Sequence, residues 1–334
     1  MHPNLCNIRY TVPILEFDLQ NDCDVTALHL AEHAAFGQYN LADQIDKIAY
    51  NYGGFRVEAH IDKNSMDFSL SFYGEFAKEA IKFFQDFIAN TEKPIDERSL
   101  KRYKKELREE LAELDETYGQ YSILRREIFT NHPFDLVSGG LKKEISNITL
   151  TQVNKYKSLI KDHGNYFLSY SRNFDPSFIP SLLNPIRASK SLNILPTVKS
   201  EKASVPGAIA FILPPISGRR ISELFGALDF ISNNQDLFKT LSFSLSSQPG
   251  LSLFLLFYRQ KNAVTKFQKA LEDDLLINLA AKYALNVGLE RQILPDLCTE
   301  DLALDWQNKF DREDLPINKL LQDISVMISS IKLK

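Results

Sequence analysis

The segment His29-Leu-Ala-Glu32-His33 constrains the fold of this chain more than any other part of its sequence. Residues four apart lie one turn apart on the same helix face, so the two imidazoles converge only if the segment is helical. Two imidazole nitrogens suit a zinc ion, and a carboxylate that is not a ligand can accept a proton from water. The pattern is short, however, and an ordinary helix with two surface histidines and a glutamate would also contain it.

Length and composition predict a soluble, globular protein of two domains. The chain has 334 residues, more than one domain usually contains. It is 44% hydrophobic and 25% charged, and its net charge of −4 comes from interspersed signs, which argues against nucleic acid as a partner. Because we find no apolar run of about eighteen residues and no secretory signal, we expect a cytoplasmic protein without a membrane partner.

The first ninety residues alternate between the patterns of strands and helices. Strands show alternating apolar and polar residues, whereas helices repeat apolar residues every three or four positions. In order, the predicted elements are a strand over 8–18, a helix over 25–36, a helix over 41–50 that ends at Gly53-Gly54, strands over 56–61 and 66–72, and a helix over 77–90. The short polar turn between the two later strands predicts a hairpin.

This order of elements resembles the N-terminal domain of the pitrilysin-type zinc peptidases, the M16 or inverzincin family. His29, Glu32 and His33 match the H-x-x-E-H motif of the family, and residues 53–59 are similar to its glycine and following strand, whose edge receives substrate backbone. Glu58 departs from the asparagine that the family usually has. The resemblance implies an α+β fold of two pseudo-repeated domains, each an antiparallel or mixed sheet with helices packed on it, and zinc as the cofactor.

A zinc site with two histidines needs a third protein ligand, commonly a carboxylate. The charged helix predicted over 94–114 offers Glu109 and Glu110. Its apolar stripe consists of Leu100, Tyr103, Leu107, Leu111 and Leu114. Glu110 lies on the same helix face as this stripe, whereas Glu109 lies about 100° around the helix and faces more toward solvent. The family resemblance implies Glu110 as the ligand, with Glu109 as the close alternative. The family often has a second acidic residue at the position of Tyr103, and Glu106 could replace it.

The resemblance continues to about residue 175, and the second half looks like a shortened copy of the family's second domain. Prolines between residues 175 and 206 indicate an extended connection, so we expect domains at 1–180 and 207–334 joined by a linker at 181–206. The elements predicted in this half are a strand over 207–213, a helix over 221–231, a strand over 250–258, one long helix over 264–284 and a terminal helix over 317–331.

Two groups that assist catalysis in the family are missing from this second half. Full-length members carry an arginine and a tyrosine there, which help to hold substrate and stabilise the oxyanion. If Gly250-Leu251 is aligned with the glycine-leucine pair of the family, these positions fall on Ser246 and Leu253. Loss of such groups typically lowers turnover about a hundredfold or more.

The resemblance therefore implies the zinc-bearing subunit of a two-chain peptidase that cleaves short or unfolded peptides, such as a precursor or leader peptide. His29, His33 and Glu110 would hold zinc, and Glu32 would act as the general base. A second M16-like subunit, or a second copy of the chain, would supply the arginine and tyrosine. The alternative is a peptide-binding or scaffolding subunit that performs no chemistry. A third possibility is an accidental motif in an unrelated fold.

Overall fold

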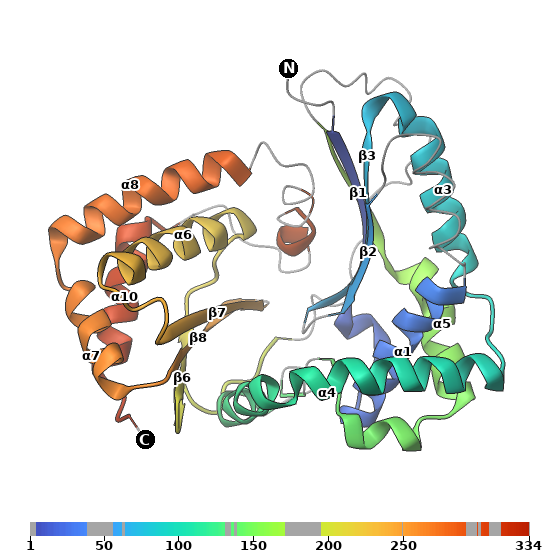
Figure 1. Ribbon diagram of the computed structural model, residues 1–334, viewed down its shortest axis with the longest axis horizontal. Helices are drawn as coiled ribbons and strands as arrows, with labels where there is room; N and C mark the ends of the chain where they lie inside the picture. The colour runs from blue at the N-terminus through green and yellow to red at the C-terminus, as the bar shows by residue number, and fades with distance from the viewer. Residues whose placement is uncertain are drawn as a thin grey trace. The chain divides into compact units, whose positions relative to one another are not determined.

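The structure is a computed structural model, and it describes residues 5–38, 56–61, 64–130, 135–136, 139–170, 195–248, 250–291, 299, 302–306 and 315–333. The chain divides into two compact units (Figure 1). The first comprises 1–118, 136–193 and 294–303, and the second comprises 119–135, 194–293 and 304–334. The helix predicted over 41–50 and most of the predicted linker lie outside the described residues. The domain boundaries at 180 and 207 stay a prediction.

The first unit contains a four-stranded antiparallel sheet in the order β2-β3-β1-β4. Its strands are β1 (Leu5–Pro13), β2 (Arg56–Ile61), β3 (Ser65–Tyr73) and β4 (Asn165–Tyr170). The predicted hairpin is confirmed, because Ile61 pairs with Met66 where β2 turns into β3. The predicted first strand over 8–18 was too long. It ends at Pro13, which has no N–H to extend the ladder, and a 3-10 helix follows over Ile14–Phe17.

Helices pack around the first sheet, and one of them, α1, carries the motif (Figure 1). They are α1 (Asp22–Gln38), α3 (Ala77–Asn90), α4 (Glu97–Ile128) and α5 (Leu150–His163). Helix α1 is apolar on nearly all sides, as expected of a helix inside a core. Six of its apolar residues are at most 3% exposed: Ala27, Leu28, Leu30, Ala31, Ala34 and Ala35. The motif is therefore held in the interior of the unit.

The second unit contains another four-stranded antiparallel sheet, in the order β5-β6-β8-β7. Its strands are β5 (Lys202–Val205), β6 (Ala208–Leu213), β7 (Leu241–Gln248) and β8 (Leu251–Tyr258). Its helices include α6 (Gly218–Asn234), α7 (Lys261–Ala270), α8 (Asp274–Arg291) and α10 (Ile317–Ser329). Phe211, Phe254 and Leu256 form part of a buried core between this sheet and the helices.

The two sheets share one arrangement, which confirms the predicted α+β fold of two repeated units. In each sheet the second strand of a hairpin, β3 or β8, pairs with a central strand, β1 or β6. In each sheet a fourth strand, β4 or β5, pairs with the other edge of that central strand. The repeat differs in chain order, because β4 follows its central strand whereas β5 precedes it.

One expectation for the second half was wrong. The helix predicted over 264–284 is two helices, α7 and α8, with a break at residues 271–273. The Asp273 Oδ1 atom accepts hydrogen bonds from the backbone N–H groups of Leu275 (2.9 Å) and Leu276 (3.1 Å). This N-terminal capping starts a new helix, although the apolar pattern alone continues through the break and predicts a single helix. Strand β5 falls within the stretch of 181–206 that the sequence predicted as a linker.

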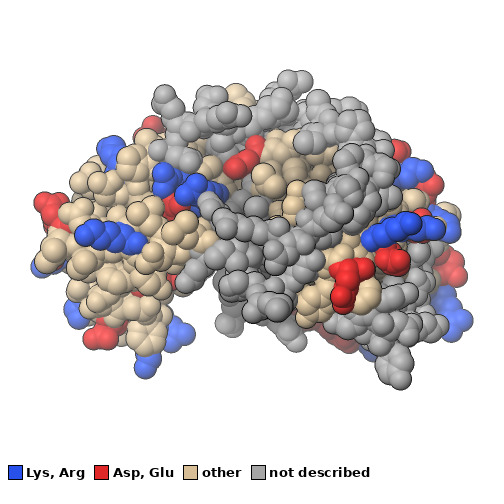
Figure 2. Space-filling view, turned by 90° about the horizontal axis from the view of Figure 1, so that it is seen from above, with Lys and Arg blue, Asp and Glu red and all other residues tan. Residues whose placement is uncertain are grey.

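Basic and acidic side chains are interspersed on the described part of the face shown in Figure 2. This agrees with the mixture of charges along the sequence. Among the described residues, no helix has both the length and the apolar character needed to cross a bilayer.

The buried Lys157 on α5 should give the stability of the protein a distinctive pH dependence. Burial lowers the pKa of Lys157 from its ordinary 10.5 to about 8. Between these pH values the unfolded chain binds more protons than the folded chain, so this residue makes stability rise with pH. We expect the free energy of unfolding of the wild type, relative to Lys157→Met, to increase between pH 7.5 and 10 by on the order of 2 kcal/mol.

Urea denaturation across this pH range measures the difference. Lys155→Met is the matched control, because Lys155 is on the same helix and exposed. Its stability should follow the wild-type pH profile. Parallel profiles for Lys157→Met and the wild type would contradict the prediction.

Candidate metal centre

Helix α1 brings three ligand-bearing side chains together in the interior of the first unit. His29 and Glu32 are buried, at 5% and 7% exposed, and His33 lies near the surface. One ligand atom from each of the three lies within 4.8 Å of the others. The Nε2 atoms of His29 and His33 are 3.8 Å and 4.0 Å from Glu32 Oε2. These distances can accommodate a metal ion between the side chains.

A backbone carbonyl fixes the orientation of the first histidine. His29 Nδ1 lies 2.9 Å from the carbonyl oxygen of Gly139. A carbonyl oxygen can only accept, so Nδ1 carries the proton and Nε2 keeps its lone pair. Histidines that bind metal characteristically donate their other N–H in this way. His29 is therefore already in the tautomer that a metal ion requires, with Nε2 directed at the other site residues.

The loop that supplies this carbonyl is attached to α1 through a second contact. Gly139 and Gly140 both have positive φ, of 73° and 85°, which glycine adopts without strain. Leu141 N donates to Thr26 Oγ1 at 2.8 Å. The approach is so close that a Cβ at Gly140 would lie 2.6 Å from the Thr26 Cα. Sequence patterns do not reveal this role, because a backbone carbonyl has no signature in residue type.

Helix α4 contributes the fourth group, Glu110. Its Oε2 is 3.0 Å from His33 Nε2, and its Oε1 is 3.5 Å from His29 Nε2. Both distances are shorter than those from Glu32 to the same nitrogens. Glu109, by contrast, is exposed and pairs with Lys105 at 3.8 Å. The structure thus brings Glu110, and not Glu109, to the two histidines.

Packing between α4 and α1 sets this position of Glu110. Tyr103 is 2% exposed, and its ring would be only 2.6 Å from a Cβ at Gly37 of α1. Leu107 and Leu111, which flank Glu110 on this face of α4, are 0% and 7% exposed. The buried stripe therefore holds α4 against the core, and Glu110 projects from the same face toward the histidines.

Glu106 is a further carboxylate near the histidines. It precedes Glu110 by one helical turn, and its Oε2 atom lies 4.0 Å from His33 Nδ1. Tyr103, one turn before it, fills space between α4 and α1. Glu106 is thus placed to interact with Nδ1 of His33, whereas Glu110 contacts Nε2, and this is the supporting position that the sequence analysis considered.

The four titratable groups set one another's charge. Burial, followed by the charge of His33, lowers the pKa of His29 to about 4, so this imidazole is neutral at pH 7. Burial raises the pKa of Glu32 to about 7. Burial lowers the pKa of His33, but the hydrogen bond with Glu110 and the charges of nearby carboxylates outweigh it, and the net shift is upward. The hydrogen bond with His33 lowers the pKa of Glu110.

These residues fit a zinc ion by the chemistry of their donor atoms. Two imidazole nitrogens and one carboxylate oxygen form a common three-ligand set that leaves a fourth position open. His29 presents a free lone pair, and a metal ion would replace the proton shared by His33 and Glu110. Glu32 is the more distant carboxylate from both nitrogens, which leaves it available for proton transfer.

The second unit has no charged group at the two positions that the sequence analysis singled out. Ser246 on β7 pairs directly with Leu253 on β8, and both side chains are fully buried. The Ser246 hydroxyl accepts a hydrogen bond from Gln248 Nε2 at 2.5 Å. Gly250, in the turn between these strands, has a φ of 78°. Ser246 and Leu253 are therefore structural residues of the hairpin.

Comparison with known proteins identifies the fold. No protein-family model and no curated protein sequence matches the chain. A protease from Helicobacter pylori matches with a TM-score of 0.64 and 15% identity, over 97% of this chain and 91% of that chain. A protein from Alicyclobacillus acidocaldarius described as an M16-like peptidase matches with a TM-score of 0.60 and 13% identity, over 98% and 89%. The chain has the fold of the M16-like peptidases.

A chain in complex III2 from Candida albicans, in a structure with Inz-5 bound, is similar to the same degree. Its TM-score is 0.63 at 12% identity, over 99% of this chain and 86% of that chain. The fold thus occurs both in proteins described as proteases and in a chain of a larger complex. At these identities the likeness shows the fold alone, so the function must be argued from the side chains.

Substitution of Gly140 by alanine should weaken metal binding without removing any side chain of the site. The new Cβ would collide with the Thr26 backbone and displace the loop, and with it the Gly139 carbonyl that orients His29. Loss of such an outer hydrogen bond typically lowers metal affinity about 10- to 100-fold. Competition with a zinc chelator measures the change.

Gly250→Ala is the matched control. Gly250 also has a positive φ, but a Cβ there would meet only Leu195 Cδ2, at 3.9 Å. It should share the backbone strain and keep the zinc affinity of the wild type. Equal zinc affinities for Gly140→Ala and Gly250→Ala would show that the loop does not orient His29.

Glu110→Gln should lower zinc affinity at least about tenfold, because an amide oxygen is a weaker ligand than a carboxylate. Glu109→Gln removes the same charge from the adjacent position, where the side chain points away from the histidines. It should bind zinc like the wild type. The opposite ranking of the two variants would identify Glu109 as the ligand.

Proposed function

We propose that this chain is the zinc-bearing subunit of a peptide hydrolase. The observation that supports this most directly is the convergence of His29, His33 and Glu110, with Glu32 beside both histidines. The M16-like fold and its match to a protein described as a protease agree with this proposal. We propose short or unfolded peptides, such as a precursor or leader peptide, as the substrates.

The side chains have distinct roles in this proposal. His29, His33 and Glu110 would hold zinc, which would supply Lewis acidity and bring the pKa of a water in its open position to about 7. Glu32 accepts a proton from the water that attacks the peptide carbonyl and then donates it to the leaving amine nitrogen. Before an ion binds, burial raises the pKa of Glu32 to about 7, and its position beside both histidines suits a group that accepts and then donates a proton.

The edge strand β2 is the proposed binding surface for the peptide backbone. It is the outermost strand of the first sheet in the described part of the chain, and Glu58 and His60 on it are exposed. An extended peptide can add to such an edge through backbone hydrogen bonds. This mode of binding favours unfolded substrates, because a folded protein does not present a free extended segment.

We further propose that a second M16-like subunit, or a second copy of this chain, completes the active site. Ser246 and Leu253 provide no cation or phenol to stabilise an oxyanion. Stabilisation of that charge is usually a large part of catalysis, so its absence predicts weak activity for the chain alone. The alternative is a subunit that binds peptides or supports a complex without chemistry, and the fold is compatible with it because it also occurs in a chain of complex III2.

Glu32→Gln separates the two functions. Glutamine preserves the shape of the side chain but cannot accept the proton, so we expect peptide hydrolysis to fall at least about a hundredfold while zinc content is retained. A quenched-fluorescence peptide library, incubated with zinc and the chain alone or with a second M16-like chain from the same genome, measures turnover. Glu109→Gln is the control for loss of charge and should retain activity.

The outcome that would reject the peptidase proposal is specific. No turnover, either by the chain alone or with the second M16-like chain, would reject the proposal, and so would equal turnover for Glu32→Gln and the wild type. If peptides bind without cleavage, the scaffolding alternative is supported.

A further inference from the structure

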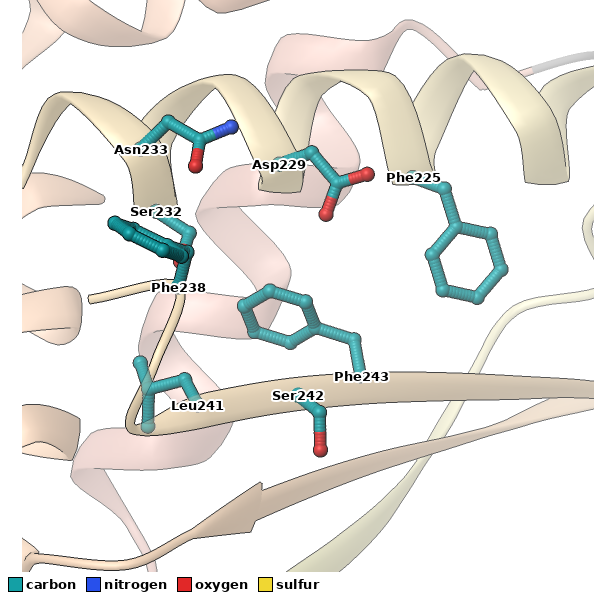
Figure 3. Close-up of a pocket in the computed structure, with 8 residues that line it drawn as sticks. All are labelled: Phe225, Asp229, Ser232, Asn233, Phe238, Leu241, Ser242 and Phe243. Atoms are coloured by element: carbon teal, nitrogen blue, oxygen red, sulfur yellow. The ribbon is translucent and has the colours of Figure 1, made fainter. Parts of the chain in front are cut away.

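A pocket of about 310 Å³ lies in the second unit, between α6 and the edge strand β7 (Figure 3). Its volume is at the lower end of the range for small-ligand sites. The residues of α6 that line it are Phe225, Asp229, Ser232 and Asn233. They recur at intervals of four, three and one, so they share one face of the helix. The pocket contains none of the residues of the candidate metal centre.

Aromatic rings form much of the wall. Figure 3 shows the ring of Phe225 directed from α6 toward β7 and the ring of Phe243 directed from β7 toward α6. Phe238 is 55% exposed and lies at the rim. Lys239 Nζ is 5.4 Å from the centroid of the Phe238 ring, so this ring already contacts a cation. The wall therefore suits an apolar body and accepts positive charge on its ring faces.

Two polar groups in the pocket have unused hydrogen-bonding capacity. Ser232 is 3% exposed, and its hydroxyl makes no hydrogen bond with the described residues. A buried polar group without a partner is unfavourable unless a ligand or water satisfies it. The Asp229 carboxylate is at the exposed rim, and Figure 3 shows it between the rings of Phe225 and Phe243. No ion pair joins it to a described cation, and its partly apolar surroundings raise its pKa.

We propose that this pocket binds a protonated amine carried on an apolar body about the size of one aromatic ring. The ammonium group would pair with the Asp229 carboxylate and donate to the Ser232 hydroxyl, while the apolar body would pack among Phe225, Phe238 and Phe243. The same chemistry occurs in a free arylalkylamine and in a basic side chain beside an apolar residue of a peptide. The proposal does not depend on the peptidase function, because it concerns binding in the second unit.

Charge distinguishes this ligand from other apolar molecules. A carboxylate on the same body would be repelled by Asp229, and a neutral alcohol would lose the ion pair. Three probes of similar size therefore test the proposal: 2-phenylethylamine, 2-phenylethanol and 3-phenylpropionate. Titration of the full chain, followed by NMR, should give a Kd of about 1 mM for the amine, about fivefold weaker binding for the alcohol and no binding of the acid.

Two variants assign the contacts. Asp229→Asn should lower the affinity for the amine about fivefold, to that for the alcohol, and should leave the affinity for the alcohol unchanged. Ser232→Ala should weaken the amine without lowering thermal stability, because the hydroxyl has no partner among the described residues. Asp323→Asn is the control for charge, since Asp323 lies on α10 and pairs with Lys319. It should bind all three probes like the wild type.

A peptide probe distinguishes the two possible sources of the amine. Acetyl-Phe-Lys-amide carries the ammonium beside an aromatic side chain, and tighter binding than 2-phenylethylamine would identify a peptide as the ligand. Weaker binding would identify a free amine. The proposal is overturned if the amine shows no saturable binding, if the acid binds as well as the amine, or if Asp229→Asn leaves amine affinity unchanged.

Discussion

The hydrogen bond between His29 Nδ1 and the Gly139 carbonyl determines what the motif helix can do. Without this acceptor, either ring nitrogen of His29 could carry the proton, and the ring could rotate. With it, the Nε2 lone pair is fixed toward Glu110 and Glu32 before any ion arrives. Preorganisation of this kind lowers the free-energy penalty of metal binding, because the His29 side chain does not have to be ordered when the ion binds. The site therefore depends on a loop as much as on the helix that bears the motif.

The burial of α1 accounts for the electrostatics of the site. Small and aliphatic residues surround His29 and Glu32, so neither side chain has enough water around it to stabilise its charge. His33 and Glu110 are closer to the surface, and their hydrogen bond helps to raise the pKa of His33 and lowers that of Glu110. One short stretch of α1 thus holds a neutral imidazole, His29, a carboxyl group whose pKa is raised to about 7, Glu32, and an imidazole whose pKa is raised, His33. Burial sets the first two of these, whereas the hydrogen bond with Glu110 and the charges of nearby carboxylates set the third.

Sequence patterns predicted the parts of the fold that depend on periodicity. Residues of β2 and β3 alternate clearly, and the stripe of α4 placed Glu110 on the inward face. The carbonyl of Gly139 could not be predicted, because every residue has a carbonyl and only the fold selects one. Strand β7 was missed although Leu241, Phe243 and Leu245 alternate with serines, since a serine-rich stretch also resembles a loop. The start of α8 depends on a side-chain cap that interrupts an otherwise continuous apolar pattern.

The repeated sheets differ in how their outer strands would meet another chain. In the described residues, β2 and β7 are the corresponding outermost strands. Strand β2 contains Arg56, Glu58 and His60, and charged side chains on an edge discourage indiscriminate pairing with other strands. Strand β7, Leu-Ser-Phe-Ser-Leu-Ser-Ser-Gln, has no charge. A fragment limited to the second unit would therefore carry the greater risk of aggregation, and the charged edge of the first unit would favour partners of complementary charge.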